Sequence, residues 1–277
     1  MRPEKSATEE TRAESAVALE SLTRRFGDIT AVDSISLEIS YGEIFGLLGP
    51  NGAGKSTTIK ILTTLLEKNS GSARVAGFDV AEEPSEVRNQ IGYVPQALSA
   101  DGGLTAWENL TLTAKLYDIP ARERAPRIND TLGFIGLAEF ADRLVKTFSG
   151  GMIRRLELAM AMLHRPRILF LDEPTIGLDP VAKRAMWEKL LELKKGYGMT
   201  ILLTTHDMDE ADLLCDRLAI MHKGRITASG TPAGLKASVG EGATLEDVFA
   251  RYSKGVMTEG GSYRDVRQAR RTLNRLG

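Results

Sequence analysis

Short and almost wholly apolar runs, separated by polar and turn-forming stretches, recur along the chain. They lie at residues 44–48, 91–94, 168–171 and 200–205, and they lack the apolar–polar alternation of a strand with one solvated face. Continuous apolar runs of this length are typical of strands that are buried on both faces, as in a parallel sheet. Because helical patterns separate the later runs, the pattern predicts an α/β fold with a parallel-sheet core.

A long stretch between two of these runs has a different period. No strand is predicted from residue 104 to about residue 163, where apolar residues recur at helical spacing. The expected helices span residues 106–117, 121–133 and 150–163. We therefore expect a helical subdomain, at about residues 98–163, inserted into an α/β unit that spans residues 17–235.

The two ends of the chain depart from this pattern. Residues 1–16 are rich in charge and lack an apolar core segment, which predicts a disordered tail rather than a signal peptide or a membrane span. Residues 236–277 form a C-terminal extension. Within it, residues 262–277 combine arginines with apolar residues at helical spacing, which predicts a basic amphipathic helix. The apolar runs elsewhere are far shorter than a bilayer span.

Composition mainly excludes classes of protein. The chain has 277 residues, of which 42% are hydrophobic, as expected for a globular protein of one or two domains. Lys and Arg total 36 against 37 for Asp and Glu, so the net charge of -1 provides no overall field toward nucleic acid or an anionic membrane. The single cysteine, Cys215, excludes an intramolecular disulfide and is interpreted as an apolar helix residue. His164 and His222 are assigned structural or surface roles.

The first candidate for chemistry is a glycine-rich loop between the run at residues 44–48 and a helix predicted from residue 56 to 66. Its glycines let successive N–H groups turn around phosphate oxygens, and the helix adds its N-terminal dipole. Lys55 is placed to reach the outer phosphates of a nucleotide, and the Ser56 hydroxyl to bind Mg²⁺. The predicted nucleotide-binding residues here are Gly49, Pro50, Asn51, Gly52, Ala53, Gly54, Lys55, Ser56 and Thr57.

Two carboxylates follow the run at residues 168–171, at the end of a buried strand where ligands bind in such sheets. Asp172 is the better Mg²⁺ partner, through water, and Glu173 the better candidate to orient an attacking water. A merely solvated acidic turn before Pro174 is the alternative. The glycine-rich loop upstream disfavours it.

Two further polar residues lie where strands are predicted to end. His206 follows the run at residues 200–205, and we assign it a contact with the γ-phosphate. The acids after it, Asp207 and Glu210, are interpreted as a capping pair at a helix start rather than as metal ligands. Gln96 lies just before the helical subdomain, which places its amide near the metal and its backbone at the hinge.

A second phosphate-binding pattern, Ser149-Gly150-Gly151, opens the helix predicted at residues 150–163. One interpretation is a simple N-cap, in which Ser149 satisfies the first N–H groups of the helix. The other is an anion site, since such a helix start leaves N–H groups free. A second phosphate-binding turn has no role in an ordinary single-chain ATPase. Its presence therefore indicates half of a site that another copy completes.

Taken in order, these segments resemble the nucleotide-binding subunits of ATP-binding cassette (ABC) transporters over residues 17–232. The resemblance implies a P-loop NTPase core with an inserted α-helical subdomain. It identifies residues 49–57 with the Walker A loop and residues 168–172 with the Walker B strand. Other roles follow by position: Glu173 as the catalytic glutamate, Gln96 in the Q-loop, Asp179 in the D-loop Gly177-Leu178-Asp179, His206 as the switch histidine, and Phe26 as the aromatic that stacks on adenine.

The family's signature sequence is altered at both ends here. Phe148 and Met152 replace the outer residues of the commonest form, Leu-Ser-Gly-Gly-Gln. The resemblance implies that the Ser149 hydroxyl and the Gly151 N–H contact the γ-phosphate of ATP bound by a second copy, whereas Met152 lacks the usual glutamine amide. An active enzyme, which hydrolyses ATP to ADP and phosphate, is expected.

Within the family, residues 148–159, residues 244–249 and the arginine-rich tail resemble drug-exporter ATPases of the daunorubicin-resistance type. The resemblance implies a homodimer around ATP, a separate multi-span permease, a position on the cytoplasmic face of the membrane, and no nucleic-acid partner. The basic helix has three interpretations: a dimer contact, a contact with the permease or anionic lipid, or a solvated helix.

Two other classes of protein share some of these motifs. A cassette ATPase that acts on ribosomes or nucleic acid shares the catalytic motifs. The long coiled coils of the DNA-repair type and the second cassette of the translation type are not seen in this sequence. A P-loop GTPase explains neither Ser149-Gly150-Gly151 nor Gln96.

Overall fold

The structure is a computed structural model that describes residues 15–254. The basic helix predicted at residues 262–277, and residues 1–14 of the predicted tail, lie outside the described residues. Ser15 and Ala16 were also predicted as tail, but they begin strand β1 (Ser15–Phe26) and are buried. Ser15 pairs with Ser40 of the neighbouring strand, a long-range contact that local composition does not reveal.

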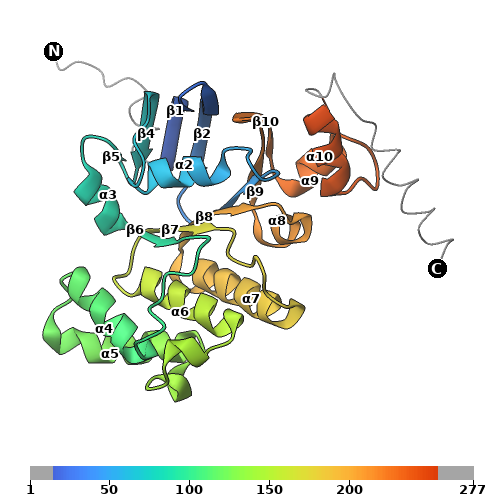
Figure 1. Ribbon diagram of the computed structural model, residues 1–277. Helices are drawn as coiled ribbons and strands as arrows, with labels where there is room; N and C mark the ends of the chain where they lie inside the picture. The colour runs from blue at the N-terminus through green and yellow to red at the C-terminus, as the bar shows by residue number, and fades with distance from the viewer. Residues whose placement is uncertain (1–14, 255–277) are drawn as a thin grey trace, which may run out of the picture.

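The centre of the molecule is a mixed, mostly parallel sheet (Figure 1). Its core strands β3, β8, β7 and β6 are parallel to one another, which confirms the predicted strands, and β9 continues them beside β3. β10 is antiparallel to β9 at one edge. In sheet order the strands are β10 (Arg225–Gly230), β9 (Arg217–His222), β3 (Ile44–Leu48), β8 (Thr200–Thr205), β7 (Ile168–Asp172) and β6 (Ile91–Val94).

Both faces of this sheet are buried. Along β7, Ile168 and Phe170 join one apolar cluster, whereas Leu169 and Leu171 join the other. Successive side chains on a strand point to opposite faces, so an unbroken apolar run fills two cores at once. The continuous runs in the sequence therefore have a direct structural cause.

A second, antiparallel sheet covers one of these faces. It consists of β2 (Ile29–Ser40), β1, β4 (Ser70–Val75) and β5 (Phe78–Asp79), in that order. Helix α2 (Lys55–Leu62) lies between the two sheets, and α3 (Pro84–Gln90) leads from β5 to β6 (Figure 1). The sequence did not predict a separate sheet. Helix α2 ends at Leu62, short of the predicted residue 66.

The helical insertion consists of α4 (Ala106–Leu116), α5 (Ala121–Phe134) and α6 (Gly150–Met162), joined by short turns η1 (Ala138–Phe140) and η2 (Val145–Thr147). The three predicted helices are thus confirmed. They pack on a core of their own that includes Leu110, Ile128 and Leu156. A reciprocal capping box between Thr105 and Glu108 begins α4. In Figure 1 the insertion lies below the mixed sheet.

The remaining helices cover the other face of the mixed sheet. They are α7 (Pro180–Tyr197), α8 (Met208–Leu214), α9 (Pro232–Ala237) and α10 (Leu245–Lys254). Apolar residues such as Leu190, Leu235 and Val248 place α7, α9 and α10 in one cluster with β3, β7 and β8. In the described part of the chain, the helices are too short or too polar for a membrane span.

Candidate active site

The glycine-rich loop follows β3 and leads into α2, the context that the sequence predicted. A side chain at Gly49 or Gly54 would clash with a backbone carbonyl, of Met221 and Ala31 respectively, and Gly54 has a φ of 105°. Gly52 faces open space but has a φ of 78°, so its backbone conformation is the reason for glycine. Within the described chain, α2 has no side-chain cap. Its first N–H groups can therefore bind an anion.

Lys55 is buried beneath this loop. Its Nζ donates to the carbonyl oxygens of Gly49 at 2.8 Å and Pro50 at 3.2 Å, and lies 3.3 Å from Glu173 Oε1. Both charged side chains are at most 5% exposed. A buried charge requires compensation, so the lysine of the nucleotide loop and the glutamate that follows β7 neutralise one another.

The predicted metal-binding residues Ser56 and Asp172 are in contact. Ser56 Oγ donates to Asp172 Oδ1 at 2.9 Å, and Thr204 Oγ1 donates to the same oxygen at 2.6 Å. Hydroxyl and carboxylate oxygens are the donors that Mg²⁺ prefers. The described residues contain no cluster of three or more His, Cys, Asp or Glu. A site with so few protein ligands fits a Mg²⁺ ion that also binds nucleotide phosphates and waters.

Thr204 is a site residue that the sequence analysis missed. It pairs with Asp172 across the parallel strands β7 and β8, and it accepts a hydrogen bond from the Glu173 N–H at 3.0 Å. The only local signal was a hydroxyl near the end of an otherwise apolar run. Nearby, burial and then the charge of Asp172 raise the pKa of Tyr93 to about 12, so this phenol stays protonated beside the carboxylate.

Glu173 has an unusual backbone and a partly unsatisfied side chain. Its φ of 51° is in the left-handed region, where a residue with a Cβ is strained. Within the described chain its buried Oε2 makes no hydrogen bond, although His206 Nδ1 lies 3.3 Å away. His206 is half exposed. An acceptor oxygen beside an accessible histidine is suited to binding a water.

The acids after His206 divide between two roles. Asp207 caps α8, because its Oδ1 accepts from the Glu210 N–H at 3.1 Å, as predicted. The predicted capping role of Glu210 is wrong. Its buried carboxylate accepts from Thr175 Oγ1 at 2.7 Å and from Trp187 Nε1 at 2.9 Å. Glu210 thereby ties the segment after Glu173 to α7 and α8.

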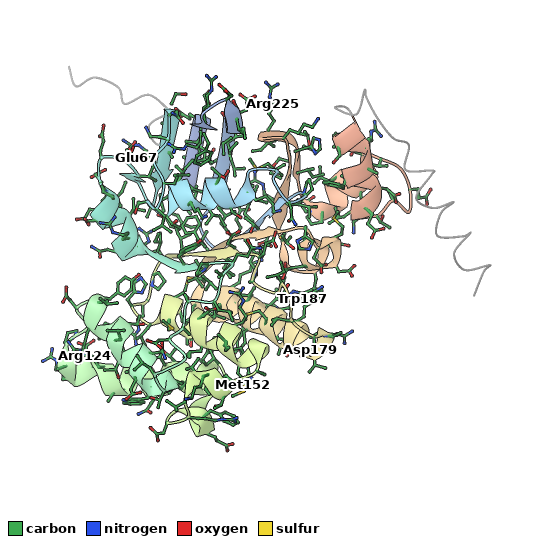
Figure 2. The ribbon with its side chains drawn as sticks, in the orientation of Figure 1. Glu67, Arg124, Met152, Asp179, Trp187 and Arg225 are labelled. Atoms are coloured by element: carbon green, nitrogen blue, oxygen red, sulfur yellow. The ribbon has the colours of Figure 1, made fainter. Side chains whose placement is uncertain are left out.

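Residues 149–151, the signature turn, lie at the exposed start of α6. Ser149 Oγ accepts from the Met152 N–H at 3.3 Å, so the N-cap interpretation is confirmed. A Cβ on Gly151 would come within 2.7 Å of the Ala182 Cβ. Asp179 caps α7 by accepting from the N–H groups of residues 181 and 182. The signature turn therefore packs against the start of α7, and Gly150 lies beside Leu178 of the D-loop, on the side where Met152 and Asp179 appear in Figure 2.

The remaining predicted residues lie at the edges of the site. Phe26 is 44% exposed at the end of β1, with the Arg24 guanidinium 4.6 Å from its ring centroid. Gln96 is exposed, and its backbone carbonyl accepts a hydrogen bond from Arg154. In the described residues, no hydrogen bond or ion pair joins the signature turn to the glycine-rich loop. The structure therefore brings the carboxylates of Asp172 and Glu173 to the glycine-rich loop, whereas the signature turn is exposed.

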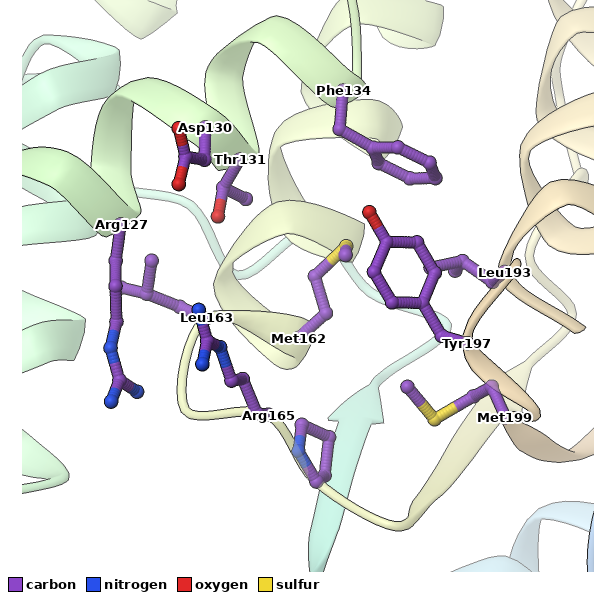
Figure 3. A pocket seen from close by; sticks show the side chains of 11 residues that line it. Arg127, Asp130, Thr131, Phe134, Met162, Leu163, Arg165, Leu193, Tyr197 and Met199 are labelled. Carbon is purple, nitrogen blue, oxygen red and sulfur yellow. The ribbon is translucent and has the colours of Figure 1, made fainter.

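A cavity of about 470 Å³ lies away from this site, between α5, the end of α6 and α7. Phe134 and Tyr197 meet edge to face at 6.0 Å on its wall (Figure 3). Residues of the glycine-rich loop do not line it. Cys215 is buried beneath β3, and burial raises the pKa of its thiol, as expected of an inert cysteine.

Comparison with known proteins identifies this arrangement. The ABC transporter family matches residues 32–176, which include the glycine-rich loop, the signature turn and both carboxylates of the β7 end. The chain belongs to the ABC transporter family. As a member it is an ATP-binding ATPase subunit, and its resemblance to that family is confirmed.

Several relatives of this ABC ATPase cover most of its length. A daunorubicin/doxorubicin resistance ATP-binding protein of Streptomyces peucetius is 46% identical over 83% of this chain and 69% of its own. A linearmycin resistance ATP-binding protein of Bacillus subtilis is 40% identical over 80% of this chain and 71% of its own. The likeness to the daunorubicin-resistance type that the sequence indicated is therefore confirmed.

Solved structures confirm the fold. An ATP-binding subunit of an ABC transporter has a TM-score of 0.78 and 31% identity, and the match covers 87% of this chain and 100% of that one. A dimeric ATP-binding cassette bound to ADP and Pi has a TM-score of 0.70 and 27% identity, over 78% and 98% of the two chains. Together with the transporter relatives, this dimer implies that an ABC ATPase subunit such as this one works in a dimer with a permease partner.

Proposed function

We propose that two copies of this chain bind two ATP molecules head to tail and power a permease that exports antibiotics or other hydrophobic compounds. The resistance proteins among the relatives support the class of cargo. The permease holds the dimer on the cytoplasmic face of the membrane, and nucleic acid has no part in the cycle.

One observation carries the head-to-tail arrangement. The glycine-rich loop, Asp172 and Glu173 form a compact site within one chain, whereas the signature turn is exposed, and within the described chain its side-chain hydrogen bonds, the N-cap and a bond from Arg155 Nε to the Gly151 carbonyl oxygen, stay within α6. A phosphate-binding turn that cannot reach the site of its own chain is suited to the ATP of another.

Within each site, the chain's own residues divide the work. The N–H groups of the glycine-rich loop bind the phosphates. Lys55 leaves its ion pair with Glu173 and binds the outer phosphates instead. The freed Glu173 carboxylate orients the attacking water, and His206 contacts the γ-phosphate. Ser56 and Asp172, joined by Gln96, would hold Mg²⁺, which neutralises phosphate charge when bound. Phe26 stacks on adenine, and Asp179 lies beside the signature turn at the dimer interface.

Replacing Glu173 by Gln tests this proposal. The change removes the carboxylate that orients water but keeps the size of the side chain, so we expect kcat to fall by about 10³-fold while ATP still binds. With Mg-ATP, size-exclusion chromatography of the isolated variant should show a stable dimer. Glu188→Gln, on the exposed side of α7, is the matched control and should behave as the parent. Full ATPase activity of Glu173→Gln would overturn the role of Glu173, and a wholly monomeric variant would overturn the ATP-bridged dimer.

A further inference from the structure

An ion pair is buried inside α6, on the helix that the signature turn begins. Arg154 Nη1 lies 2.9 Å from Glu157 Oε2, three residues apart on the same helix. The two residues are 3% and 2% exposed. The catalytic site described above does not use either charge.

Both side chains hold the loop that leads from β6 into the helical insertion. Arg154 donates to the Pro95 carbonyl oxygen at 2.7 Å and to the Gln96 carbonyl oxygen. Glu157 Oε1 accepts from the Ser99 hydroxyl at 3.0 Å and from the Ser99 N–H. In the described chain, the hydrogen bonds of residues 95–99 are all made with this pair.

Stability does not explain such a pair. Removing two charges from water costs several kcal/mol per ion, and apolar residues of similar volume often stabilise a protein as well or better. The loop that the pair holds is itself exposed at Gln96 and Ser99, so water could satisfy its backbone without these side chains. What the buried charges add is a fixed position of the loop relative to α6.

The neighbouring Arg155 shows that this arrangement is specific to one face of the helix. Its guanidinium donates to the Ile135 carbonyl oxygen at 3.0 Å, which lies inside the helical insertion. Arg154 and Glu157 instead reach out of the insertion to the end of β6. Along the helix axis, Arg154 and Glu157 lie about 7 and 12 Å from Ser149, at roughly 1.5 Å per residue.

We propose that Arg154 and Glu157 are positioning residues that join the Gln96 loop to the signature turn through the rigid start of α6. In the proposed dimer, Gln96 serves the nucleotide of its own chain and the signature turn that of the second copy. The pair therefore couples the state of one nucleotide site to the geometry presented to the other. This inference rests on the proposed head-to-tail dimer.

The decisive variant is the double change Arg154→Met and Glu157→Leu in the full-length chain. It removes both charges together, so no uncompensated charge remains buried and the chain should fold with a melting temperature near that of the parent. The glycine-rich loop is untouched, so the Kd for ATP should stay within about threefold of the parent value. We expect kcat to fall by about 10- to 100-fold, as for a displaced catalytic group. In the Glu173→Gln background, ATP-driven dimerisation should weaken by a similar factor.

Two comparisons separate coupling from general damage. The pair Lys189 and Glu192 on α7 has the same spacing but is accessible to solvent, with side chains 27% and 52% exposed, and its double alanine variant should leave kcat and dimerisation unchanged. In a double-mutant cycle, the losses of kcat caused by the Arg154/Glu157 double change and by Gln96→Ala should not add, because both changes act through one loop. The losses caused by the same double change and by Phe26→Ala should add. Amide exchange at Ser99, measured without nucleotide, should be faster in the double variant.

The outcomes distinguish this inference from the proposed function. Parent-like kcat and dimerisation in the double variant, or additive losses with Gln96→Ala, would overturn the coupling role even if the parent is an active ATPase. Unchanged exchange at Ser99 would overturn the attachment of the loop, whatever the activity. If the parent itself neither hydrolyses ATP nor dimerises as Glu173→Gln, the proposed function fails, and the coupling between sites fails with it.

Discussion

The glycine-rich loop and the signature turn are both suited to bind phosphate, but they are built in opposite ways. At the loop, Lys55 is buried with two carbonyl oxygens and Glu173 as partners, and Ser56 is bonded to Asp172. At the turn, Ser149 and Gly150 are exposed to solvent. The glycine-rich loop is assembled by the fold of a single chain, whereas the signature turn is open to solvent.

In the proposed dimer, this contrast lets each chain fold alone while it supplies only part of each nucleotide site. Buried polar groups must find partners, which is why Lys55 and Ser56 are bonded to groups of the same chain. Exposed N–H groups are satisfied by water at little cost, and they can exchange that water for phosphate when a second copy approaches. The dependence on a partner is therefore located at the surface and leaves the core unaffected.

At the signature turn, the largest effect is expected at Gly150. A Cβ there would meet only Leu178 Cδ2, at 3.9 Å, which is an ordinary contact. Gly150→Ala should therefore fold normally and bind ATP as a monomer, but the added methyl group obstructs the approach of phosphate to the turn. We expect a loss of kcat of about 10²- to 10³-fold, comparable to removing a donor from a charged transition state, together with loss of the ATP-driven dimer. ATPase assays and size-exclusion chromatography measure both.

Gly151→Ala is the matched comparison on the next residue. Its Cβ would lie 2.7 Å from the Ala182 Cβ, so α6 and α7 must move apart, at a cost of about 1 to 3 kcal/mol in unfolding free energy. Thermal denaturation should therefore separate the two variants. If Gly150→Ala retained parental activity, the signature turn would have no role at the second nucleotide.

The second prediction concerns the joint between the helical insertion and the mixed sheet. His164 follows α6, stacks on Tyr117 at 3.7 Å, and lies with Nε2 2.9 Å from the Ile91 carbonyl oxygen. Burial lowers its pKa to about 4, despite the opposing effect of that hydrogen bond. The unfolded chain, with a histidine pKa near 6.5, binds the proton more readily. Neutral His164 therefore makes its full contribution to the free energy of unfolding above about pH 6.5. As the pH falls toward 4, this contribution decreases by at most about 3 kcal/mol.

Urea denaturation of the parent at pH 7 and pH 5 measures this loss, with His164→Gln as the control. The amide cannot titrate in this range, so the variant should show a smaller difference between the two pH values. An equal pH dependence in parent and variant would assign the effect to other groups.

The third prediction concerns Phe26, at the edge of the proposed nucleotide site. If Phe26 stacks on adenine, Phe26→Ala should weaken ATP binding by about 1 to 3 kcal/mol, whereas Phe26→Tyr retains the ring face and should leave the Kd unchanged. Arg24 already contacts the ring, which leaves the other face for the base. Titration with ATP measures both variants, and a parental Kd for Phe26→Ala would exclude the stacking role.

The sequence predicted most of the loop region because its signals are local. The apolar run before Gly49 and the run before Asp172 each contain their own evidence of burial, and the glycines require a particular backbone. Thr204 and the Arg154–Glu157 pair were missed, since their roles depend on which strands and loops become neighbours. Glu210 was misassigned for the same reason. Its spacing from Asp207 suggests a cap, but Trp187, 23 residues upstream, provides a stronger partner.

The smallest effect is expected at Met152, where the family usually has glutamine. The side chain is half buried and packs against the core of the helical insertion, and its N–H is already bonded to Ser149. Met152→Gln should lose about 1 kcal/mol of apolar contact and gain an amide that can reach the nucleotide of the second copy. Because an exposed hydrogen bond contributes only about 0.5 to 1.5 kcal/mol, ATP-driven dimerisation in the Glu173→Gln background should strengthen by less than about tenfold. Met152→Leu keeps the apolar contact without the amide and should leave dimerisation unchanged. A gain in both variants would mean that packing within the chain, and not a contact with the partner's nucleotide, sets the strength of the signature turn.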